Sequence, residues 1–339
     1  MENSLEEITQ TKLQKSEIGL ILRGLSMGVA EVIPGVSGGT LAFITGIYEE
    51  LLISIKSVDM TSIRMVFSGQ FKKAWVRVNG PFLLWLAIGM FIGIVGGVFG
   101  VTFLLDKYPE VLWSLFFGCI FASIPYMLSQ VSKFNVSSIL GFVFATAVAG
   151  CLCVLQPVQA EPSLFYIFFA GIIAISALIL PGVSGSFILV LLGLYTTVIP
   201  SIKSFLSTFA MEYFSLLFVF GLGCLVGLAV FSRLLTYIYQ HHRDVTLATL
   251  SGFMLGSLIK IWPWRNPQLV LDKNSGVTRL ITDSELTRSI FHNDSLKIIS
   301  EKFVFPGSYF SDPFTLYCII GMLVGVGAVY VLARSGKIT

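Results

Sequence analysis

Two short glycine-rich stretches contain the residues best suited to chemistry. EVIPGVSGGT occupies residues 31–40, and LPGVSGS at residues 180–186 nearly repeats it. Proline lacks an amide hydrogen and glycine permits unusual backbone angles, so each stretch is expected to interrupt a helix. A helix that begins after such a break exposes N–H donors with partial positive charge, which are the ingredients of an anion site. The expected breaks are Pro34, Gly35, Pro181 and Gly182.

Hydroxyl groups in both turns add further hydrogen-bond donors for an anion. Ser37 and Thr40 follow the first break, and Ser184 and Ser186 follow the second. Small residues also serve close helix packing, and we favour that interpretation for four scattered glycines. These are Gly89, Gly93, Gly96 and Gly97. Packing alone does not need a proline break, so the paired turns favour a binding site.

A carboxylate stands just before the first turn. Glu31 lies three residues before Pro34, and its equivalent in the second stretch is Leu178. Charged residues inside a bilayer are rare and usually functional. Glu31 is therefore a candidate for coupling anion movement to an ion gradient, by taking up a proton or by helping to bind a cation such as Na+. Arg23 lies two helical turns earlier and could pair with Glu31, bind the anion or reach the membrane interface.

The composition of the chain places these turns in a membrane. Of 339 residues, 55% are hydrophobic and only 12% are charged, whereas about 25% are charged in a typical soluble domain. Residues 80–105 and 314–333 are the clearest apolar stretches long enough to cross a bilayer. The sequence therefore predicts an all-α, polytopic membrane protein. Residues 1–16 are polar and partly acidic, which predicts a cytosolic segment rather than a cleaved signal peptide.

The sequence predicts no cofactor, no metal site and no nucleic-acid partner. The cysteines all lie in apolar segments, and none of their spacings suits a metal cluster. We interpret them as free thiols that serve as small apolar side chains. They are Cys119, Cys151, Cys153, Cys224 and Cys318.

The chain contains an internal duplication. A shift of 147 positions aligns residues 24–57 with 171–204 without a gap, and 13 of these 34 positions are identical. The similarity continues at a shift of 134. There Gly89, Gly93, Gly118 and Ser123 match Gly223, Gly227, Gly252 and Ser257. Each half is predicted to be a broken or re-entrant helix hairpin followed by three transmembrane helices. Because three is odd, the second half is expected to be inverted relative to the first, as in inverted-repeat transporters.

The two repeats have distinct predicted segments. The first, 17–158, has a hairpin at 17–55 (short helices at about 17–33 and 40–55) and helices at 80–105, 110–130 and 137–158. The second, 164–334, has a hairpin at 164–200 (short helices at about 164–180 and 186–200), helices at 213–236, 245–262 and 314–333, and an outer loop at 263–312. This loop is expected to form a small cap.

Basic residues indicate which side of the membrane each connection faces. They gather on the side that holds both termini, so both termini are predicted to be cytoplasmic. Residues 57–80 on that side alternate apolar and basic side chains. This pattern is typical of an amphipathic helix on the inner leaflet, and a plain cytosolic connection is the alternative.

Both turns with their flanking segments resemble one known family. EVIPGVSGGTLAFITGIYE (31–49) and ALILPGVSGSFILVLLGLY (177–195) are similar to the motifs of bacterial polyprenyl-phosphate (undecaprenyl-phosphate) transporters of the PopT type, formerly a domain-of-unknown-function family. The resemblance implies a lipid transporter of the bacterial plasma (inner) membrane. It would return undecaprenyl phosphate from the outer to the inner leaflet, recycling the lipid carrier of cell-wall peptidoglycan synthesis. The phosphate-handling candidates that the resemblance implies are Arg23, Glu31, Ser37, Gly38, Gly39, Thr40, Ser184, Gly185 and Ser186. Coupling to a proton or sodium gradient through Glu31 is a separate hypothesis, drawn from the position of this carboxylate.

Two other functions remain as alternatives. Undecaprenyl-diphosphate phosphatases also have inverted repeats, but they carry an arginine directly after the serine of the second turn and a close pair of acidic residues. Here Gly185 follows Ser184, and only Glu49 and Glu50 lie near Glu31 in sequence. Without a cation beside the serine, phosphoryl transfer lacks its usual charge stabilisation, so we expect no enzyme. An ion-coupled transporter of a small soluble anion stays open, because fold does not fix function. The sequence does not indicate which oligomeric state the protein adopts.

Overall fold

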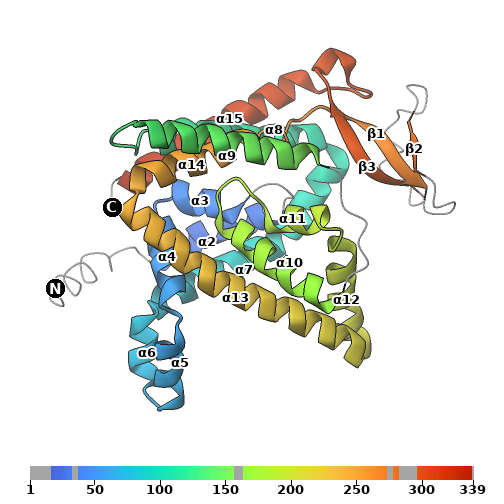
Figure 1. The fold of residues 1–339 in the computed structure, drawn as a ribbon. Helices are drawn as coiled ribbons and strands as arrows, with labels where there is room; N and C mark the ends of the chain where they lie inside the picture. Colours follow the sequence, from blue (N-terminus) through green and yellow to red (C-terminus); the bar gives the residue numbers. More distant parts are fainter. Residues whose placement is uncertain (1–16, 33–36, 156–162, 273–277, 282–295, 338–339) are drawn as a thin grey trace.

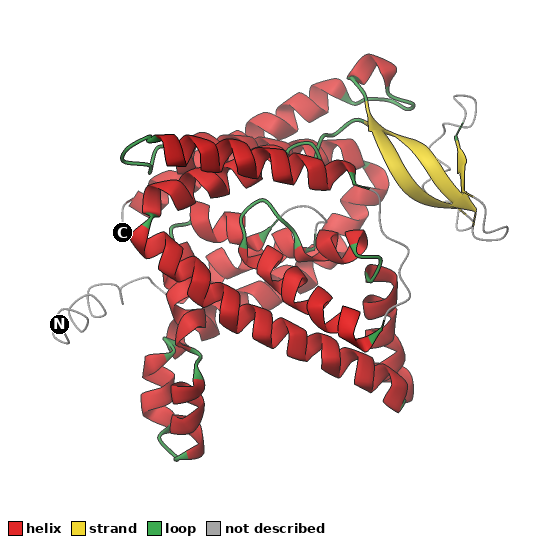
Figure 2. Cartoon of the chain, viewed as in Figure 1, coloured by secondary structure: helices red, strands yellow, loops and turns green. Residues whose placement is uncertain are grey.

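The structure is a computed structural model that describes residues 17–32, 37–155, 163–272, 278–281 and 296–337. Helices form almost all of it, and a small sheet lies at one end (Figures 1 and 2). The helices are α2 (Glu17–Glu31), α3 (Gly38–Ile44), α4 (Tyr48–Ser57), α5 (Met60–Phe67), α6 (Phe71–Arg77), α7 (Gly80–Lys107), α8 (Pro109–Leu128), α9 (Val136–Val154), α10 (Leu164–Ile179), α11 (Gly185–Leu191), α12 (Tyr195–Thr208), α13 (Met211–His241), α14 (Arg243–Ser257) and α15 (Thr315–Lys337). The strands are β1 (Arg265–Asp272), β2 (Thr278–Leu280) and β3 (Leu296–Phe303).

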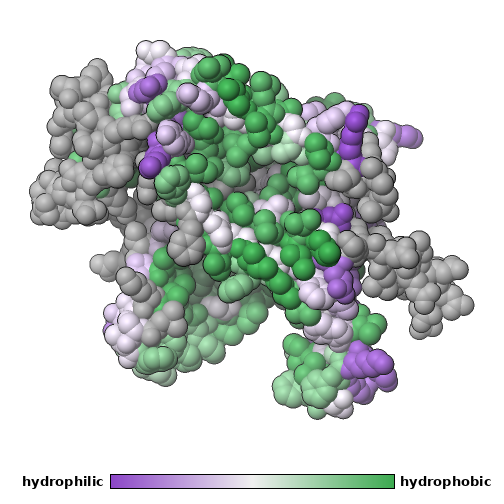
Figure 3. All heavy atoms as spheres, turned by 180° about the vertical axis from the view of Figure 1, so that it is seen from behind, coloured by the Kyte–Doolittle hydropathy of each residue, from purple (hydrophilic) through white to green (hydrophobic). Residues whose placement is uncertain are grey.

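Five of the described helices are long and apolar enough to cross a membrane. They are α7, α8, α9, α13 and α15, and the bent pair α3–α4 would make a sixth span. Their outward side chains are large and apolar, for example Phe91 and Phe144, each 69% exposed. Figure 3 shows this hydrophobic surface across the rear of the bundle. The prediction of a helical, polytopic membrane protein is confirmed, apart from the small sheet β1–β3.

Helix boundaries repeat at the spacing found in the sequence. Helices α2, α3 and α4 begin at residues 17, 38 and 48, and α10, α11 and α12 begin exactly 147 positions later, at 164, 185 and 195. Gly46 and Gly193, also 147 apart, both adopt a positive φ, of 70° and 68°. This conformation favours glycine and ends the short helix before it.

The short helix expected over 40–55 is instead two helices. Helices α3 and α4 meet at the Gly46 turn with a bend of 119°. The expected helix over 186–200 is divided in the same way into α11 and α12 at Gly193. The sequence does not predict a helix break at these glycines, because a single glycine inside an apolar run is also compatible with a continuous helix.

Glycines let the helices of each half pack backbone to backbone. A Cβ at Gly93 of α7 would overlap the carbonyl oxygen of Leu25 in α2. The equivalent Gly227 of α13 meets Ile172 of α10, where a Cβ would lie 2.7 Å from the carbonyl oxygen. The packing interpretation is confirmed for Gly89, Gly93 and Gly97. It is wrong for Gly96, since nothing lies within 4 Å of a Cβ added there.

This contrast predicts a stability difference between two alanine variants of α7. Gly93→Ala should lower the free energy of unfolding by about 1–3 kcal/mol, because the methyl group forces the backbones of α2 and α7 apart. Gly96→Ala is the matched control, three residues along the same helix, and should be neutral or slightly stabilising. Thermal unfolding of the purified protein in detergent measures both. Equal melting temperatures for the two variants would contradict the backbone contact.

Residues 57–80, for which the sequence predicts an amphipathic helix or a plain cytosolic connection, contain the two-helix α5–α6 hairpin. Gly69, with a φ of 72°, makes the turn between its helices. Asp59 caps α5 by accepting a hydrogen bond from the Ser62 amide at 2.9 Å. Its other oxygen pairs with Arg77 at the end of α6, also at 2.9 Å. One carboxylate therefore joins the two ends of the hairpin.

Acid should loosen this hairpin. The hydrogen bond from the Ser62 amide, helped by Arg77, holds the pKa of Asp59 at about 2, below its unfolded value of about 3.9. Stability from a lowered carboxyl pKa is present above the unfolded pKa and is lost as the pH falls through about 2. Trp75 fluorescence, isolated by subtracting a Trp75→Phe variant, should show this transition between about pH 4 and pH 2. In Asp59→Asn it should be absent, and an unchanged acid transition there would refute the assignment.

The predicted outer loop contains a three-stranded antiparallel sheet, ordered β2–β1–β3. It lies at the end of the long helices opposite to the hairpin (Figure 1). Two contacts fix it to the bundle. The Trp264 indole donates to the Pro313 carbonyl at 2.8 Å, and the Tyr309 hydroxyl donates to the buried Glu110 of α8 at 2.7 Å.

Candidate functional site

The two glycine-rich turns contact each other in the middle of the bundle. The Gly182 amide of the second turn donates to the Thr40 hydroxyl of the first at 3.1 Å. The Ser37 hydroxyl lies 3.3 Å from the carbonyl oxygens of both Leu178 and Leu180. Equivalent breaks from the two halves therefore meet, as the duplication suggested. Pro34 and Gly35 lie outside the described residues.

The first turn is closed by groups of its own half. The Glu31 carboxylate accepts a hydrogen bond from the Gly38 amide at 2.7 Å, and the Ser37 hydroxyl caps the Gly39 amide at 3.2 Å. Helix α3 has only seven residues, so its dipole is weak. Glu31 thus occupies the position that the sequence assigned to an external anion. Gly38 leaves room for it, because a Cβ there would lie 2.7 Å from the carboxylate oxygen.

Among the residues that the structure describes, no carboxylate bonds to the second turn as Glu31 does to the first. Ser184 is 3% exposed, and its hydroxyl lies 2.8 Å from that of Ser186. Within the described residues, the Ser184 side chain makes no capping bond to α11. Gly182, next to the buried Pro181, adopts a φ of 85°. A Cβ there would lie 2.7 Å from the Met254 backbone. Helix α14 therefore packs directly on this turn.

Lys260, which is not among the site residues predicted from the sequence, lies beside the second turn. It lines a small cavity together with Gly182, Ser184 and Ser257. Its ammonium group stands 5.0 Å from the centre of the Phe187 ring, and the turn after α14 is held by the Lys260 amide donating to the Ser257 carbonyl at 2.9 Å. The sequence did contain one indication of this residue. The shift of 134 positions aligns Lys260 with the uncharged Tyr126 of the first half. Like Glu31, Lys260 is a charge that only one half carries.

This lysine corrects one argument made from the sequence. The residue directly after Ser184 is not a cation, but Lys260 supplies one across the cavity. Arginine directly after Ser184 would not fit here, since a Cβ at Gly185 would lie 2.6 Å from the Ala174 carbonyl oxygen. The described residues that line the cavity include no histidine, aspartate or glutamate.

The cavity is too small for a phosphate group in this conformation. Its volume is about 10 Å³, which is space for roughly one water molecule. Its walls come from the second turn, from Phe187 of α11, from the end of α14, and from α9 through Ala149, Leu152 and Cys153. An anion can enter only if α9, α11 or the end of α14 moves.

Arg23 forms no ion pair with Glu31 in the part of the chain that the structure describes. The carboxylate whose charge acts on it is Glu50 of α4. Its Nη1 is buried and has no hydrogen-bond partner within the described part of the chain. Glu49, in contrast, is exposed. The suggested Arg23–Glu31 pair is therefore wrong for this conformation.

Comparison with known proteins gives consistent matches. Residues 27–279 match a family described as VCA0040-like, undecaprenyl phosphate translocase-like. The chain is 41% identical over 244 residues to a protein of Vibrio cholerae serotype O1 named polyprenyl-phosphate transporter, covering 72% of this chain and 77% of that protein. It is 31% identical over 266 residues to a protein of the same name from Staphylococcus aureus, covering 74% and 88%. No solved structure matches it. The family match includes Glu31, both turns and Lys260, and it excludes Arg23.

Proposed function

This chain belongs to the VCA0040-like family of undecaprenyl phosphate translocase-like proteins, and from that premise we propose that it carries undecaprenyl phosphate across the bacterial plasma membrane. The observation that supports this most is the convergence of Lys260 with Ser184 and Gly182 at one cavity. A phosphate monoester carries a charge of about −1.5 to −2 and three strong acceptor oxygens. An ammonium group and hydroxyls satisfy those needs.

A lipid substrate suits the surroundings of this cavity. Helix α9, which forms one wall, turns large apolar side chains outward, among them Leu140 (63% exposed) and Phe144 (69%). Movement of α9 away from α11 would open the cavity sideways to the bilayer. The phosphate head would then sit at the second turn while the prenyl tail stayed among the lipids. A soluble anion would need a water-filled entrance instead.

Transport needs a cycle in which the closed cavity opens to each leaflet in turn. We attribute this cycle to rocking of two inverted halves about the contact between their turns. In the closed conformation Glu31 occupies the first turn, so the phosphate would bind the second turn and compete with Glu31 for the first. The net movement proposed is from the outer to the inner leaflet, for reuse of the carrier in cell-wall synthesis, with both termini cytoplasmic.

Reconstitution tests this function directly. The purified chain would be placed in liposomes with labelled undecaprenyl phosphate, and exchange between leaflets would be followed with and without proton or sodium gradients. Faster exchange than in protein-free liposomes is expected. Exchange at the protein-free rate, combined with uptake of inorganic phosphate, would favour a soluble-anion transporter. Release of phosphate from undecaprenyl diphosphate would favour the phosphatase, although the family and both relatives are named as transporters.

A further inference from the structure

The α5–α6 hairpin stands outside the transmembrane bundle and plays no part in the proposed site. Its two helices run across the direction of the long helices, at the end of the bundle where α15 finishes (Figure 1). Trp75 of α6 packs against Gly80, the first residue of α7. The hairpin is therefore attached to the start of a transmembrane helix and extends sideways from it, in the plane expected for a membrane surface.

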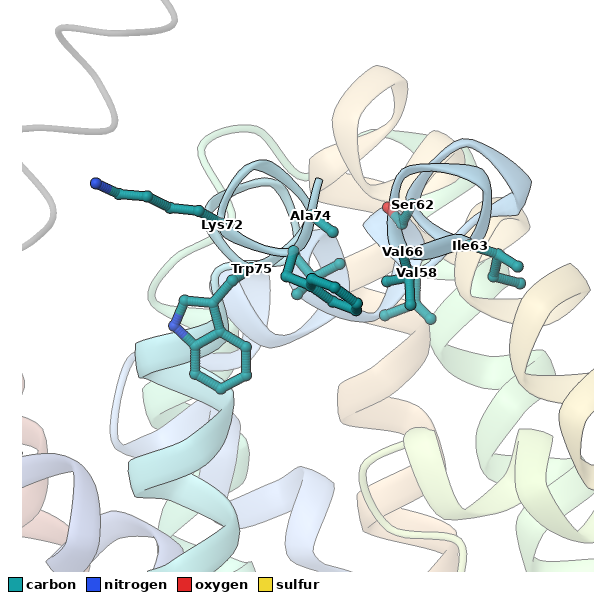
Figure 4. Close-up of a pocket in the computed structure, with 9 residues that line it drawn as sticks. Val58, Ser62, Ile63, Val66, Lys72, Ala74 and Trp75 are labelled. Carbon is teal, nitrogen blue, oxygen red and sulfur yellow. The ribbon is translucent and has the colours of Figure 1, made fainter. Parts of the chain in front are cut away.

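One side of this hairpin is apolar and uncovered. A cavity of about 540 Å³ lies between its helices, lined among others by Val58, Val66 and Trp75. Figure 4 shows these side chains on a common side of the two helices, with Lys72 directed away from it. At the tip, Phe67 is 87% exposed. A hairpin that exposed this surface to water would be unusual, because such patches normally mark a contact with a partner or a membrane.

The charge of the hairpin is strongly positive. Residues 56–78 contain five cations and one carboxylate, a formal charge of +4, whereas the whole chain carries +3. Arg64, Lys72 and Lys73 are exposed, and the single carboxylate is already paired with Arg77. In Figure 3 the hairpin is the lobe at the lower right, where hydrophilic and hydrophobic residues cover opposite sides. The surface is thus apolar on one side and cationic on the other.

We propose that the α5–α6 hairpin is an interfacial anchor that binds anionic phospholipids of the leaflet at the C-terminal end of α15. Its apolar side, with the 540 Å³ cavity, enters the boundary between head groups and acyl chains, as amphipathic helices do. Its lysines and Arg64 lie at head-group level, where each cation contributes about 1 kcal/mol, or roughly a fivefold enrichment of anionic lipid. This proposal requires that the chain lie in a membrane, but it does not depend on which substrate the chain transports.

Quenching of Trp75 by brominated lipids tests this proposal in the full-length protein. The protein would be placed in nanodiscs that contain either brominated phosphatidylglycerol or brominated phosphatidylcholine at equal, low mole fractions. The Trp75 signal is the difference between the wild type and Trp75→Phe. Both lipids should quench it, and the anionic lipid should do so at a severalfold lower mole fraction. Lys72→Glu and, independently, Lys73→Glu should reduce this preference about fivefold or more.

Lys302→Glu is the matched control, because Lys302 is an exposed lysine in β3 of the outer sheet. It should leave the lipid preference of Trp75 unchanged. Three results would overturn the proposal. Trp75 that neither lipid quenches would place the hairpin in solution, available to a protein partner. Equal quenching by both lipids would remove the role of charge. Displacement of the brominated lipid by undecaprenyl phosphate alone would indicate a substrate site instead.

Discussion

Lys260→Met should reduce leaflet exchange of undecaprenyl phosphate by roughly 10–100-fold. A hydrogen bond to a charged group contributes about 1.5–3 kcal/mol, and Lys260 is the cation at the cavity that holds Ser184. Methionine has a similar length and leaves the apolar wall around Phe187 intact. The stability of the protein should change little, because the described contact of the ammonium is with an aromatic ring at 5.0 Å, worth about 0.5–2 kcal/mol.

Two further variants separate charge from shape at this position. Lys260→Arg keeps the positive charge and should keep transport within a few fold of the wild type, although its planar head binds phosphate differently. Lys302→Met removes an exposed lysine of the outer sheet and should have no effect on exchange. Folding is checked by thermal unfolding of each variant. If Lys260→Met folds and exchanges lipid at the wild-type rate, the phosphate does not bind beside Lys260.

Much of the fold could be predicted because its pattern is local or repeated. Apolar stretches of about 20 residues predict membrane spans whatever sequence surrounds them. The duplication at a shift of 147 positions predicted that α2 and α10 begin at equivalent residues. The small sheet was not predicted. Its strands pair residues far apart in a loop of mixed polarity, for example Arg265 with Phe303, and such pairing depends on non-local contacts.

The candidate site was predictable only in part for the same reason. Ser37, Thr40 and Gly182 belong to turns whose breaks are visible in the sequence, and the structure brings them together. Lys260 reaches the second turn only because α14 packs on Gly182, a contact that no local pattern reveals. The placement of Glu31 on Gly38 also escaped prediction, because it requires the chain to fold back after the break.

The structure gives the two halves different electrostatic roles. The half with the first turn carries a carboxylate, Glu31, and the half with the second turn carries a cation, Lys260, although the helices around both turns begin at equivalent positions. A symmetrical pair of turns would bind phosphate equally well at both. This asymmetry suits a carrier, since a ligand held too tightly at every step of the cycle would not be released.

Glu31→Gln should abolish the effect of an ion gradient on leaflet exchange. The amide oxygen of glutamine can still accept the hydrogen bond from Gly38, which measures 2.7 Å for the carboxylate, so the turn should keep its shape. Glutamine cannot take up a proton and carries no charge for a sodium ion. If each transport cycle moves one elementary charge through a membrane potential of about 100 mV, the gradient supplies about 2.3 kcal/mol. That free energy corresponds to roughly a 50-fold bias in the distribution of the lipid between leaflets.

The informative quantity is the ratio of exchange with a gradient to exchange without one, measured for the same variant. In the wild type this ratio should exceed one for either protons or sodium, and the effective gradient identifies the coupling ion. In Glu31→Gln it should fall to one for both. Glu49→Gln provides the control, because Glu49 is an exposed carboxylate in the first turn of α4, away from Gly38. A Glu31→Gln ratio as high as that of the wild type would show that the carboxylate closes the first turn without coupling it to any ion.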